Sequence, residues 1–381
     1  MKNLVLFDDA GHLNLYPLTM ARSTAELRWG ILTLKEKWEQ WSGAHIAVKT
    51  AAYLQGLYAP VLEGMEWFAN ARLTPSEDIV DLLYSLKPNE GITWNNVVML
   101  YRNEPQNLRE WPLKTPPVVL EQVWDIFVQN GAQILADFTL LNQGQKPAIA
   151  HQSNTLFGSH PIFIHSTARV LCSTLNSEEG PIYVGPHAEI QEGCNVRGPF
   201  ALGDYATLKM GAKVYPGTTV GPHCKVGGEV NNSVIMGYSN KAHDGFLGNA
   251  VIGYWCNLGA DTNNSNLKNN YAEVKIWNYN AQKFVNTGLQ FCGLIMGDHS
   301  KSGINTMFNT GTVVGFSSNI FGSGFPRNYI PSFSWGGAAG MSVYALNKAL
   351  ETAQKVYARR NQALSEQEIS IFEYLFKLEQ G

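Results

Sequence analysis

Aliphatic residues recur at every sixth position through the middle of the chain. The residue two places before each of them is small in most units. A helix would repeat apolar residues at about 3.6 and a strand at about 2, so neither explains this period. A six-residue unit fits a short strand plus a turn, with one aliphatic side chain pointing inward. The pattern therefore predicts a parallel β-helix whose inward column is Val184, Ile190, Val196, Leu202, Leu208, Val214, Val220 and Val226.

The same period resumes twice, each time in a different phase. A starting pair, a second series (with polar Asn240 in one position) and a third series extend the coil to about residues 160–325. These are Ile164 and Val170; Val234, Phe246, Ile252 and Leu258; and Met296, Phe308, Val314 and Ile320. The interruptions at roughly 171–183, 227–233 and 262–291 predict loops that leave the coil, which is where repeat proteins place their binding groups.

Residues 1–145 lack this period and alternate short apolar runs with amphipathic stretches. Strands are predicted at 4–7, 45–48 and 97–101, and helices at 24–41, 74–86 and 121–141. Such alternation is typical of an α/β domain with a largely parallel sheet. From Ser342 the pattern is helical again, and two helices would cap the open end of the coil. The predicted domains are therefore 1–145, 146–330 and 331–381.

Composition narrows the class of partners. A chain of 381 residues is long enough for two domains, and its net charge of −3 gives no electrostatic argument for nucleic acid or an anionic membrane. The N-terminus does not resemble a signal peptide, and no apolar run is long enough to span a bilayer. Five cysteines show no CxxC spacing, and three occupy the small inward position of the repeat. We therefore expect reduced thiols and a cytoplasmic protein.

Polar residues crowd into the scaffold between residues 239 and 266. His243 is a candidate general base, because an imidazole changes protonation near neutral pH and can take a proton from an attacking amine. Lys209 and Lys241 are candidates to hold a phosphate. Asparagines in this stretch can hydrogen-bond sugar hydroxyls or a thioester carbonyl. The alternative is that His243 is a surface turn residue and the asparagines form a structural ladder.

A metal site is not expected. Zinc in a β-helix needs several histidines on adjacent coils. The candidate histidines have no common spacing in the repeat; they are His187, His223, His243 and His299.

Two sets of motifs carry a resemblance to a known family. The first set resembles the acetyltransferase half of the bifunctional N-acetylglucosamine-1-phosphate uridylyltransferase/glucosamine-1-phosphate N-acetyltransferase. Its motifs are Lys241-x-His243, Phe246-Leu247-Gly248, Asn257-Leu258-Gly259-Ala260 and Asn266. The whole chain also resembles a shorter bacterial variant of that family, described as a sugar nucleotidyltransferase. The motifs shared with this variant include Leu6-Phe7-Asp8-Asp9 and Trp124-Asp125-Ile126-Phe127.

The resemblance implies a left-handed β-helix of hexapeptide repeats, assembled as a homotrimer with active sites between neighbouring subunits. It makes His243 the base that deprotonates an amino-sugar phosphate for attack on acetyl-CoA. It assigns Lys209 and Lys241 to the sugar phosphate, Asn257 and Asn266 to the sugar, and Ala260 to the acetyl-CoA thioester.

Two positions depart from the family pattern and leave the substrates open. Phe246 and Leu267 stand where the family has tyrosines near the sugar. The identities of the acceptor sugar and of the acyl group are therefore not fixed by the resemblance.

For the N-terminal half the resemblance implies a nucleotidyltransferase that uses a nucleoside triphosphate and Mg²⁺. Such domains carry a glycine-rich loop after the first strand that cradles phosphates. Here the loop reads Asp8-Asp9-Ala10-Gly11-His12, with two carboxylates. Arg22 is predicted to lie near the phosphates, and Lys35 to add positive charge unless it lies on a solvated helix face.

The main hypothesis is therefore a sugar-1-phosphate nucleotidyltransferase and amino-sugar-phosphate N-acyltransferase in nucleotide-sugar biosynthesis for the cell envelope. Two alternatives stay open. One is an acyltransferase for another amino sugar with a degenerate, non-catalytic N-terminal domain. The other is a structural hexapeptide scaffold.

Overall fold

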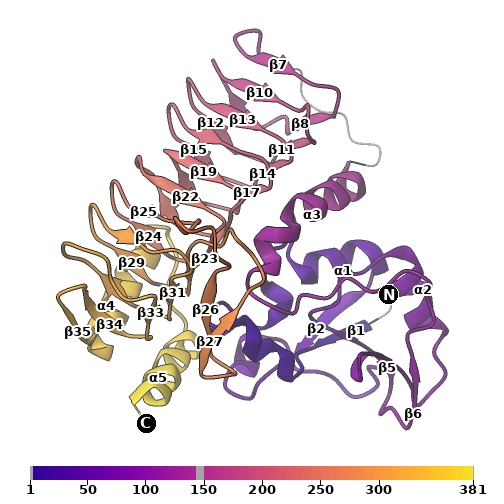
Figure 1. Cartoon of the computed structure of the whole chain (residues 1–381). Helices are drawn as coiled ribbons and strands as arrows, with labels where there is room; N and C mark the ends of the chain where they lie inside the picture. The colour runs from indigo at the N-terminus through magenta and orange to yellow at the C-terminus, as the bar shows by residue number, and fades with distance from the viewer. Residues whose placement is uncertain (1–2, 143–149, 381) are drawn as a thin grey trace.

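The chain folds into an N-terminal α/β domain, a long parallel β-helix and two C-terminal helices (Figure 1). The computed structural model describes residues 3–142 and 150–380. This arrangement confirms the fold class predicted from the six-residue repeat. Within the described residues there is no helix long and apolar enough to cross a membrane.

The β-helix has three faces, each a sheet of parallel strands stacked along the coil axis. The N-domain face contains β8 (Ile162–Ile164), β11 (Ile182–Val184), β14 (Phe200–Leu202), β17 (Thr218–Val220), β20 (Val234–Gly237), β23 (Val251–Tyr254), β28 (Ile295–Met296), β31 (Val313–Val314) and β33 (Tyr329–Ile330). The C-helix face contains β9 (Arg169–Val170), β12 (Glu189–Ile190), β15 (Thr207–Leu208), β18 (Lys225–Val226), β21 (Asn240–Lys241), β24 (Asn257–Leu258), β29 (Lys301–Ser302), β32 (Asn319–Ile320), β34 (Ser334–Gly337) and the antiparallel β35 (Gly340–Val343). The open face contains β7 (Thr155–Phe157), β10 (Thr174–Asn176), β13 (Asn195–Arg197), β16 (Lys213–Val214), β19 (Glu229–Asn231) and β22 (Phe246–Gly248), followed by the pair β25 (Asn263–Asn264) and β30 (Met307–Phe308).

The inward column from Val184 to Val226 is buried as predicted, and the third series and the starting pair also face the core. The second series is wrong by one residue at three positions, because Ile235, Lys241 and Leu247 face inward instead of Val234, Asn240 and Phe246. The physical reason is that two repeat units are short. Inward positions 226, 230 and 235 are four and five residues apart, which shifts the phase.

Two of the three predicted loops are wrong. Residues 171–183 contain β10 and most of β11, and residues 227–233 contain β19, so both stretches stay within the coil. Their apolar residues join the inward column. The stretch 262–291 does leave the coil after β25, and forms an antiparallel hairpin of β26 (Lys275–Asn278) and β27 (Lys283–Asn286).

The sheet of the N-terminal domain is mixed, not largely parallel. Its order is β2 (His45–Lys49), β1 (Asn3–Phe7), β3 (Trp67–Asn70), β5 (Val97–Arg102), β4 (Glu90–Trp94) and β6 (Asn107–Glu110). The pairs β1·β2, β1·β3 and β4·β6 are parallel, while β5 is antiparallel to both of its neighbours. The turn between β4 and β5 explains the difference, since Asn95 and Asn96 adopt positive φ and close a hairpin.

Of the five helices in the described residues, α1 begins ten residues later than predicted, while the other four lie close to their predicted positions. The domain has α1 (Leu34–Ser42), α2 (Glu77–Ser85) and α3 (Asp125–Leu141), with 3-10 turns η1 (Ala10–Leu15), η2 (Thr24–Glu26) and η3 (Gln55–Leu57). The helix predicted from residue 24 begins only at Leu34, because Thr33 and Glu36 form a capping box. Gly30 also interrupts it, with φ of +93° and no space for a Cβ atom.

The N-terminal domain packs against the N-domain face of the β-helix (Figure 1). In α3, Asn130 donates from Nδ2 to the carbonyl oxygen of Gly217 at 2.8 Å and to Oγ1 of Thr219 at 2.9 Å. The Thr219 hydroxyl in turn donates to the Gly30 carbonyl at 3.0 Å. Residues of the turn before α1 are therefore anchored on the coil.

The C-terminal helices are α4 (Leu346–Ala358) and α5 (Glu366–Gln380), as predicted. They cover the corner between the N-domain face and the C-helix face. Tyr357 of α4 stacks on Trp255 with ring centroids 4.0 Å apart, and Phe372 of α5 meets His299 edge to face at 4.9 Å. The helices are thus held on the side of the coil by aromatic contacts.

Candidate functional site

The predicted catalytic residue lies at the exposed corner between the C-helix face and the open face. His243 follows β21, and Ala260 follows β24 on the next rung. The two rungs are in register, because Asn240 pairs with Asn257 and the Asp261 amide donates to the Asp244 carbonyl at 3.0 Å. His243 and Ala260 therefore occupy equivalent positions on neighbouring rungs.

The side chain of His243 is exposed, and within residues 3–142 and 150–380 no hydrogen bond to its imidazole is formed. Its backbone is fixed from inside the coil, because Nζ of Lys241 donates to the His243 carbonyl oxygen at 2.6 Å. Gly245 turns the chain into β22 with φ of +117°, and a Cβ atom there would lie 2.3 Å from the Thr262 carbonyl oxygen. Only glycine fits this turn, which fixes how the chain enters β22, while the His243 imidazole has no hydrogen bond in the described part of the chain.

Lys241 lies inside the coil, in the inward position opposite Val226. Its exposed fraction is 2%, and burial lowers its pKa to about 8 despite the opposing carboxylates of Asp244 and Asp261. The ammonium group supports the corner backbone and does not reach the surface in this conformation. A phosphate contact from Lys241 stays a prediction.

The other predicted substrate residues divide into two groups. Lys209 and Asn257 lie on the same side of the coil as His243. Lys209 contacts Gly227 of the next rung, and Gly227 in turn contacts Ala242 of the rung that carries His243. Asn257 is exposed on β24. Asn266 lies at the opposite end of the open face, where its Nδ2 donates to Oδ1 of Asn249 at 2.8 Å. One protomer therefore gathers four of the six predicted residues at one corner, keeps Lys241 inside the coil beneath it, and leaves Asn266 apart.

The loop after β1, where a triphosphate would be cradled, is closed by an ion pair. Both oxygens of the Asp9 carboxylate accept from the Arg72 guanidinium, at 2.8 and 2.6 Å, and Asn70 donates to it at 2.9 Å. Burial raises the pKa of Asp9, but the charge and hydrogen bonds of Arg72, with further hydrogen bonds from Asn70 and the Gly11 amide, together lower it overall. The Asp8 carboxylate accepts from the Thr50 hydroxyl at 2.6 Å. Both oxygens of the Asp9 carboxylate thus face Arg72 in this conformation, and Mg²⁺ binding at this loop stays a prediction.

The predicted nucleotide-binding cations are engaged with protein carboxylates. Arg22 pairs with the buried Asp298 of the β-helix, and its guanidinium lies 3.9 Å from the ring centroid of Tyr254. Lys35 lies 3.7 Å from the Glu26 carboxylate. Nucleotide binding by either residue stays a prediction.

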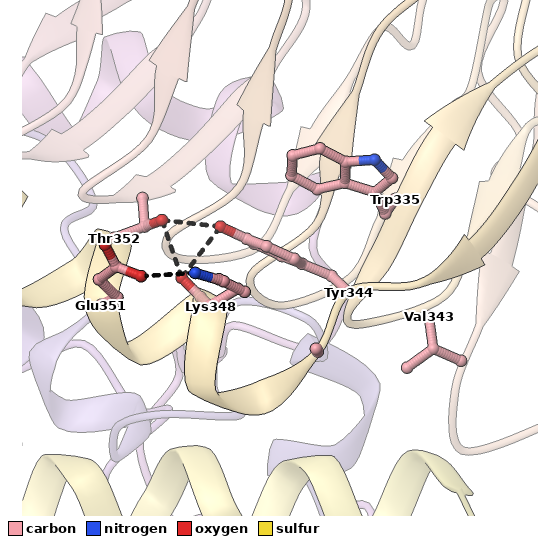
Figure 2. Close-up of a pocket in the computed structure, with 7 residues that line it drawn as sticks. Trp335, Val343, Tyr344, Lys348, Glu351 and Thr352 are labelled. Carbon is pink, nitrogen blue, oxygen red and sulfur yellow. Dashed lines mark hydrogen bonds and ion pairs between the residues drawn. The ribbon is translucent and has the colours of Figure 1, made fainter.

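Several cavities adjoin the C-helix face in the described part of the chain. One, of about 550 Å³, lies where β35 leads into α4 (Figure 2). Its polar groups already contact one another: Tyr344 and Thr352 share a hydrogen bond of 2.7 Å, and Lys348 contacts Glu351 at 3.1 Å. A second, of about 440 Å³, is lined by Asn257 and by two arginines directly after α4 that the sequence patterns did not reveal. Among the described residues, no group of three or more His, Cys, Asp or Glu is placed to hold a metal ion.

Fold and site together define a two-part architecture, an α/β domain joined to a parallel β-helix with an exposed histidine corner. Residues 4–146 match the family described as sugar nucleotidyl transferase. The chain is 30% identical over 145 residues to the bifunctional sugar-1-phosphate nucleotidylyltransferase/acetyltransferase of Sulfurisphaera tokodaii, covering 38% of this chain and 36% of that protein. It is 27% identical over 167 residues to the bifunctional protein GlmU of Clostridium beijerinckii, covering 42% and 30%.

The chain is therefore GlmU-like, and the relatives that it resembles are transferases by name. The matches span about a third of the length of these two curated relatives. Among solved structures, the polysialic-acid-specific acetyltransferase NeuO aligns with a TM-score of 0.28 and 14% identity, covering 51% of this chain and 87% of that one.

Proposed function

We propose that the His243 corner transfers an acyl group from acyl-CoA to an amino-sugar phosphate. The observation that carries this proposal is the free imidazole of His243 beside Ala260 on the next rung, with Asn257 nearby. The names of the relatives, which combine sugar-1-phosphate nucleotidyl transfer with acetyl transfer, support it.

In the proposed reaction the imidazole of His243 accepts a proton from the amino group of the sugar. As that proton is removed, the amine nitrogen attacks the thioester carbonyl carbon and the carbon–sulfur bond breaks. The imidazolium returns the proton to the departing thiolate, so CoA leaves as the thiol and His243 is regenerated as the base. An amine near neutral pH needs such a base, and imidazole is matched to that pH. Lys241 contributes by fixing the backbone of His243, while Asn257 offers an amide to sugar hydroxyls.

The test is the variant His243→Ala with an amino-sugar phosphate and acetyl-CoA, followed by CoA release. We expect kcat to fall by roughly 10²–10⁴ with little change in substrate binding, and the acidic limb of the pH–rate profile to disappear. His160→Ala, at an exposed histidine far along the coil, is the matched control. Near-full activity in His243→Ala would remove this catalytic assignment.

The quaternary structure that we propose is a homotrimer, with the histidine corner facing a neighbouring coil. Large apolar side chains flank His243 at the same corner, since Met210 and Ile304 are each 70% exposed. Exposed apolar groups beside a site mark a surface that another chain or ligand covers. Sedimentation equilibrium at micromolar concentration should give three times the mass of 42.1 kDa; a monomer would contradict the trimer.

For the N-terminal domain, the family match of residues 4–146 supports nucleotidyl transfer to a sugar 1-phosphate. The closed Asp9–Arg72 loop instead favours a second candidate, a non-catalytic domain that docks on an acyltransferase. Calorimetric titration with each of the four nucleoside triphosphates and Mg²⁺ decides between them. A saturable heat supports nucleotidyl transfer, and its absence with all four supports the second candidate.

Five unpaired cysteines support a reducing, cytoplasmic location.

A further inference from the structure

A basic cavity of about 440 Å³ lies between the end of α4 and the C-helix face. Its floor is formed by β18, β21, β24 and β29, and one wall by the rings of Tyr238 and Trp255. Ala242, which immediately precedes His243, also lines it. The cavity therefore adjoins the proposed acyl-transfer corner.

Four cationic side chains line this cavity and no carboxylate does: Lys225, Lys301, Arg359 and Arg360. None of the four forms an ion pair with a carboxylate of residues 3–142 or 150–380. Clustered charges of one sign in a concave site repel one another unless an anion lies among them. The cavity is therefore complementary to an anion.

Two of these cations are held in place by backbone carbonyls. Nζ of Lys301 donates to the His299 carbonyl oxygen at 2.7 Å, and Nη2 of Arg360 donates to that of His223 at 3.0 Å. An ammonium has three donors and a guanidinium five, so both keep donors free for a ligand. Burial lowers the pKa of Lys301 to about 8. An anion bound beside the ammonium group would raise this pKa again.

The floor presents a regular row of side chains on four successive strands. The outward residues are, in order, Lys225, Asn240, Asn257 and Lys301, because these positions pair with one another in the sheet. Neighbouring strands lie about 4.8 Å apart, so the row is about 14 Å long. Amides that donate and accept hydrogen bonds thus lie between two cationic ends.

We propose that this cavity binds a hydroxyl-bearing organic phosphate of the sugar-phosphate class. Its phosphate lies among the lysine and arginine side chains, and its hydroxyl groups contact the amides of Asn240 and Asn257. The inference rests on the proposed acyl transfer, because it places the phosphate of the acceptor here and its amino group toward His243. It differs from the assignment of that phosphate to Lys241, which is buried.

The test is calorimetric binding to the full-length protein with no acyl donor present. The probes are glucosamine 1-phosphate, inorganic phosphate and coenzyme A, each at 50 and 200 mM salt. We expect glucosamine 1-phosphate to bind more tightly than inorganic phosphate and to weaken as salt rises. Lys225→Gln and Arg359→Gln should each weaken it about tenfold, since charge-assisted hydrogen bonds to a phosphate are lost. Both side chains are exposed, so these variants should fold.

Lys355→Gln is the control, because Lys355 lies on the exposed side of α4 and pairs with Glu351. It should bind as the wild type does. Binding of coenzyme A alone, equal binding of inorganic phosphate and the sugar phosphate, or tight binding that survives both cavity variants would overturn the proposal. So would the absence of binding.

A second readout comes from Lys301. The pKa of Lys301 is about 8 in the free protein, and the phosphate group of a bound ligand should raise it. Titrations with glucosamine 1-phosphate at pH 8, in two buffers of different ionisation heat, should therefore show that the protein takes up protons on binding. Uptake that is absent would contradict the placement of the phosphate. Binding with these properties but without CoA release would retain the cavity and remove the acyl-transfer proposal, so the two failures are distinguishable.

Discussion

Replacing Arg22 by methionine should destabilise the contact between the N-terminal domain and the β-helix. The Arg22 guanidinium is 17% exposed, while the Asp298 side chain that it pairs with is 2% exposed. The other Asp298 oxygen accepts from the Tyr254 amide at 2.8 Å. Arg22→Met therefore leaves a buried carboxylate with one hydrogen bond and no counter-charge, which costs about 3–5 kcal/mol.

That magnitude sets the expected change in melting temperature. With about 2.1 cal/mol/K of unfolding entropy per residue, a chain of this length has roughly 0.8 kcal/mol/K, so the midpoint should fall by about 4–6 °C. Asp298→Asn should cost less, because an amide still accepts from Tyr254 and the partly exposed Arg22 can be hydrated. Adding Asp298→Asn to Arg22→Met should recover part of the loss.

The pH dependence gives a sharper test. Burial raises the pKa of Asp298 above its ordinary value, against the opposing effect of Arg22. Without Arg22 the pKa of Asp298 rises further above its value in the unfolded chain. The folded variant then binds a proton more tightly than the unfolded variant does, so the Arg22→Met protein regains stability as pH falls. Differential scanning fluorimetry should show a larger gap to wild type at pH 7.5 than at pH 5.5. A gap that is zero, or equal at both pH values, would refute the reasoning. Lys348→Gln, at an exposed pair, should change little.

Two further predictions concern the coil. Val214→Asp places a carboxylate in the inward column, where Val214 is 3% exposed, and should abolish cooperative unfolding, whereas Lys213→Asp on the outward side of the same strand should not. A soluble, cooperatively folded Val214→Asp protein would contradict the burial argument. Lys241 has a pKa of about 8 in the fold against 10.5 ordinarily, so the unfolded chain binds more protons between these values and wild-type stability should rise with pH there. Relative to Lys241→Met, the wild-type melting temperature should therefore increase from pH 8 to pH 10; parallel curves would show that the ammonium is not desolvated.

The six-residue period predicted the β-helix because each unit must bury one side chain, and that requirement repeats wherever the coil is regular. It failed where the corner turns shorten, between Val226 and Ile235, since the period carries no information on turn length. The late start of α1 follows from a similar limit. Apolar spacing alone extends the helix back to residue 24, but Gly30 and the Thr33 cap stop it.

The strict period also misses part of the candidate site. In the structure His243 and Ala260 follow inward positions on adjacent rungs, but they are 17 residues apart, one fewer than the 18 residues that the period requires. It did not predict that Lys241 points inward, because a lysine in an aliphatic position contradicts the pattern itself. Arg359 and Arg360 reach the same face although they lie more than 100 residues after His243 in the chain, and no local signal links them to it.

One buried cluster connects all three parts of the chain. Arg22 of the N-terminal domain reaches Asp298 of the coil, and the next residue, His299, contacts Phe372 of α5. Trp255 lies beside this cluster, stacks on Tyr357 of α4 and forms a wall of the basic cavity. Tyr357 is only two residues before the first cavity arginine, so the aromatic stack that holds α4 also sets the position of the cavity cations. A change that loosens the docked N-terminal domain should therefore weaken anion binding on the far side of Trp255. We therefore expect the docked N-terminal domain to support the proposed acyl-transfer corner; loss of anion binding in Arg22→Met, measured by the same calorimetric titration, would bear this out, and unchanged binding would contradict it.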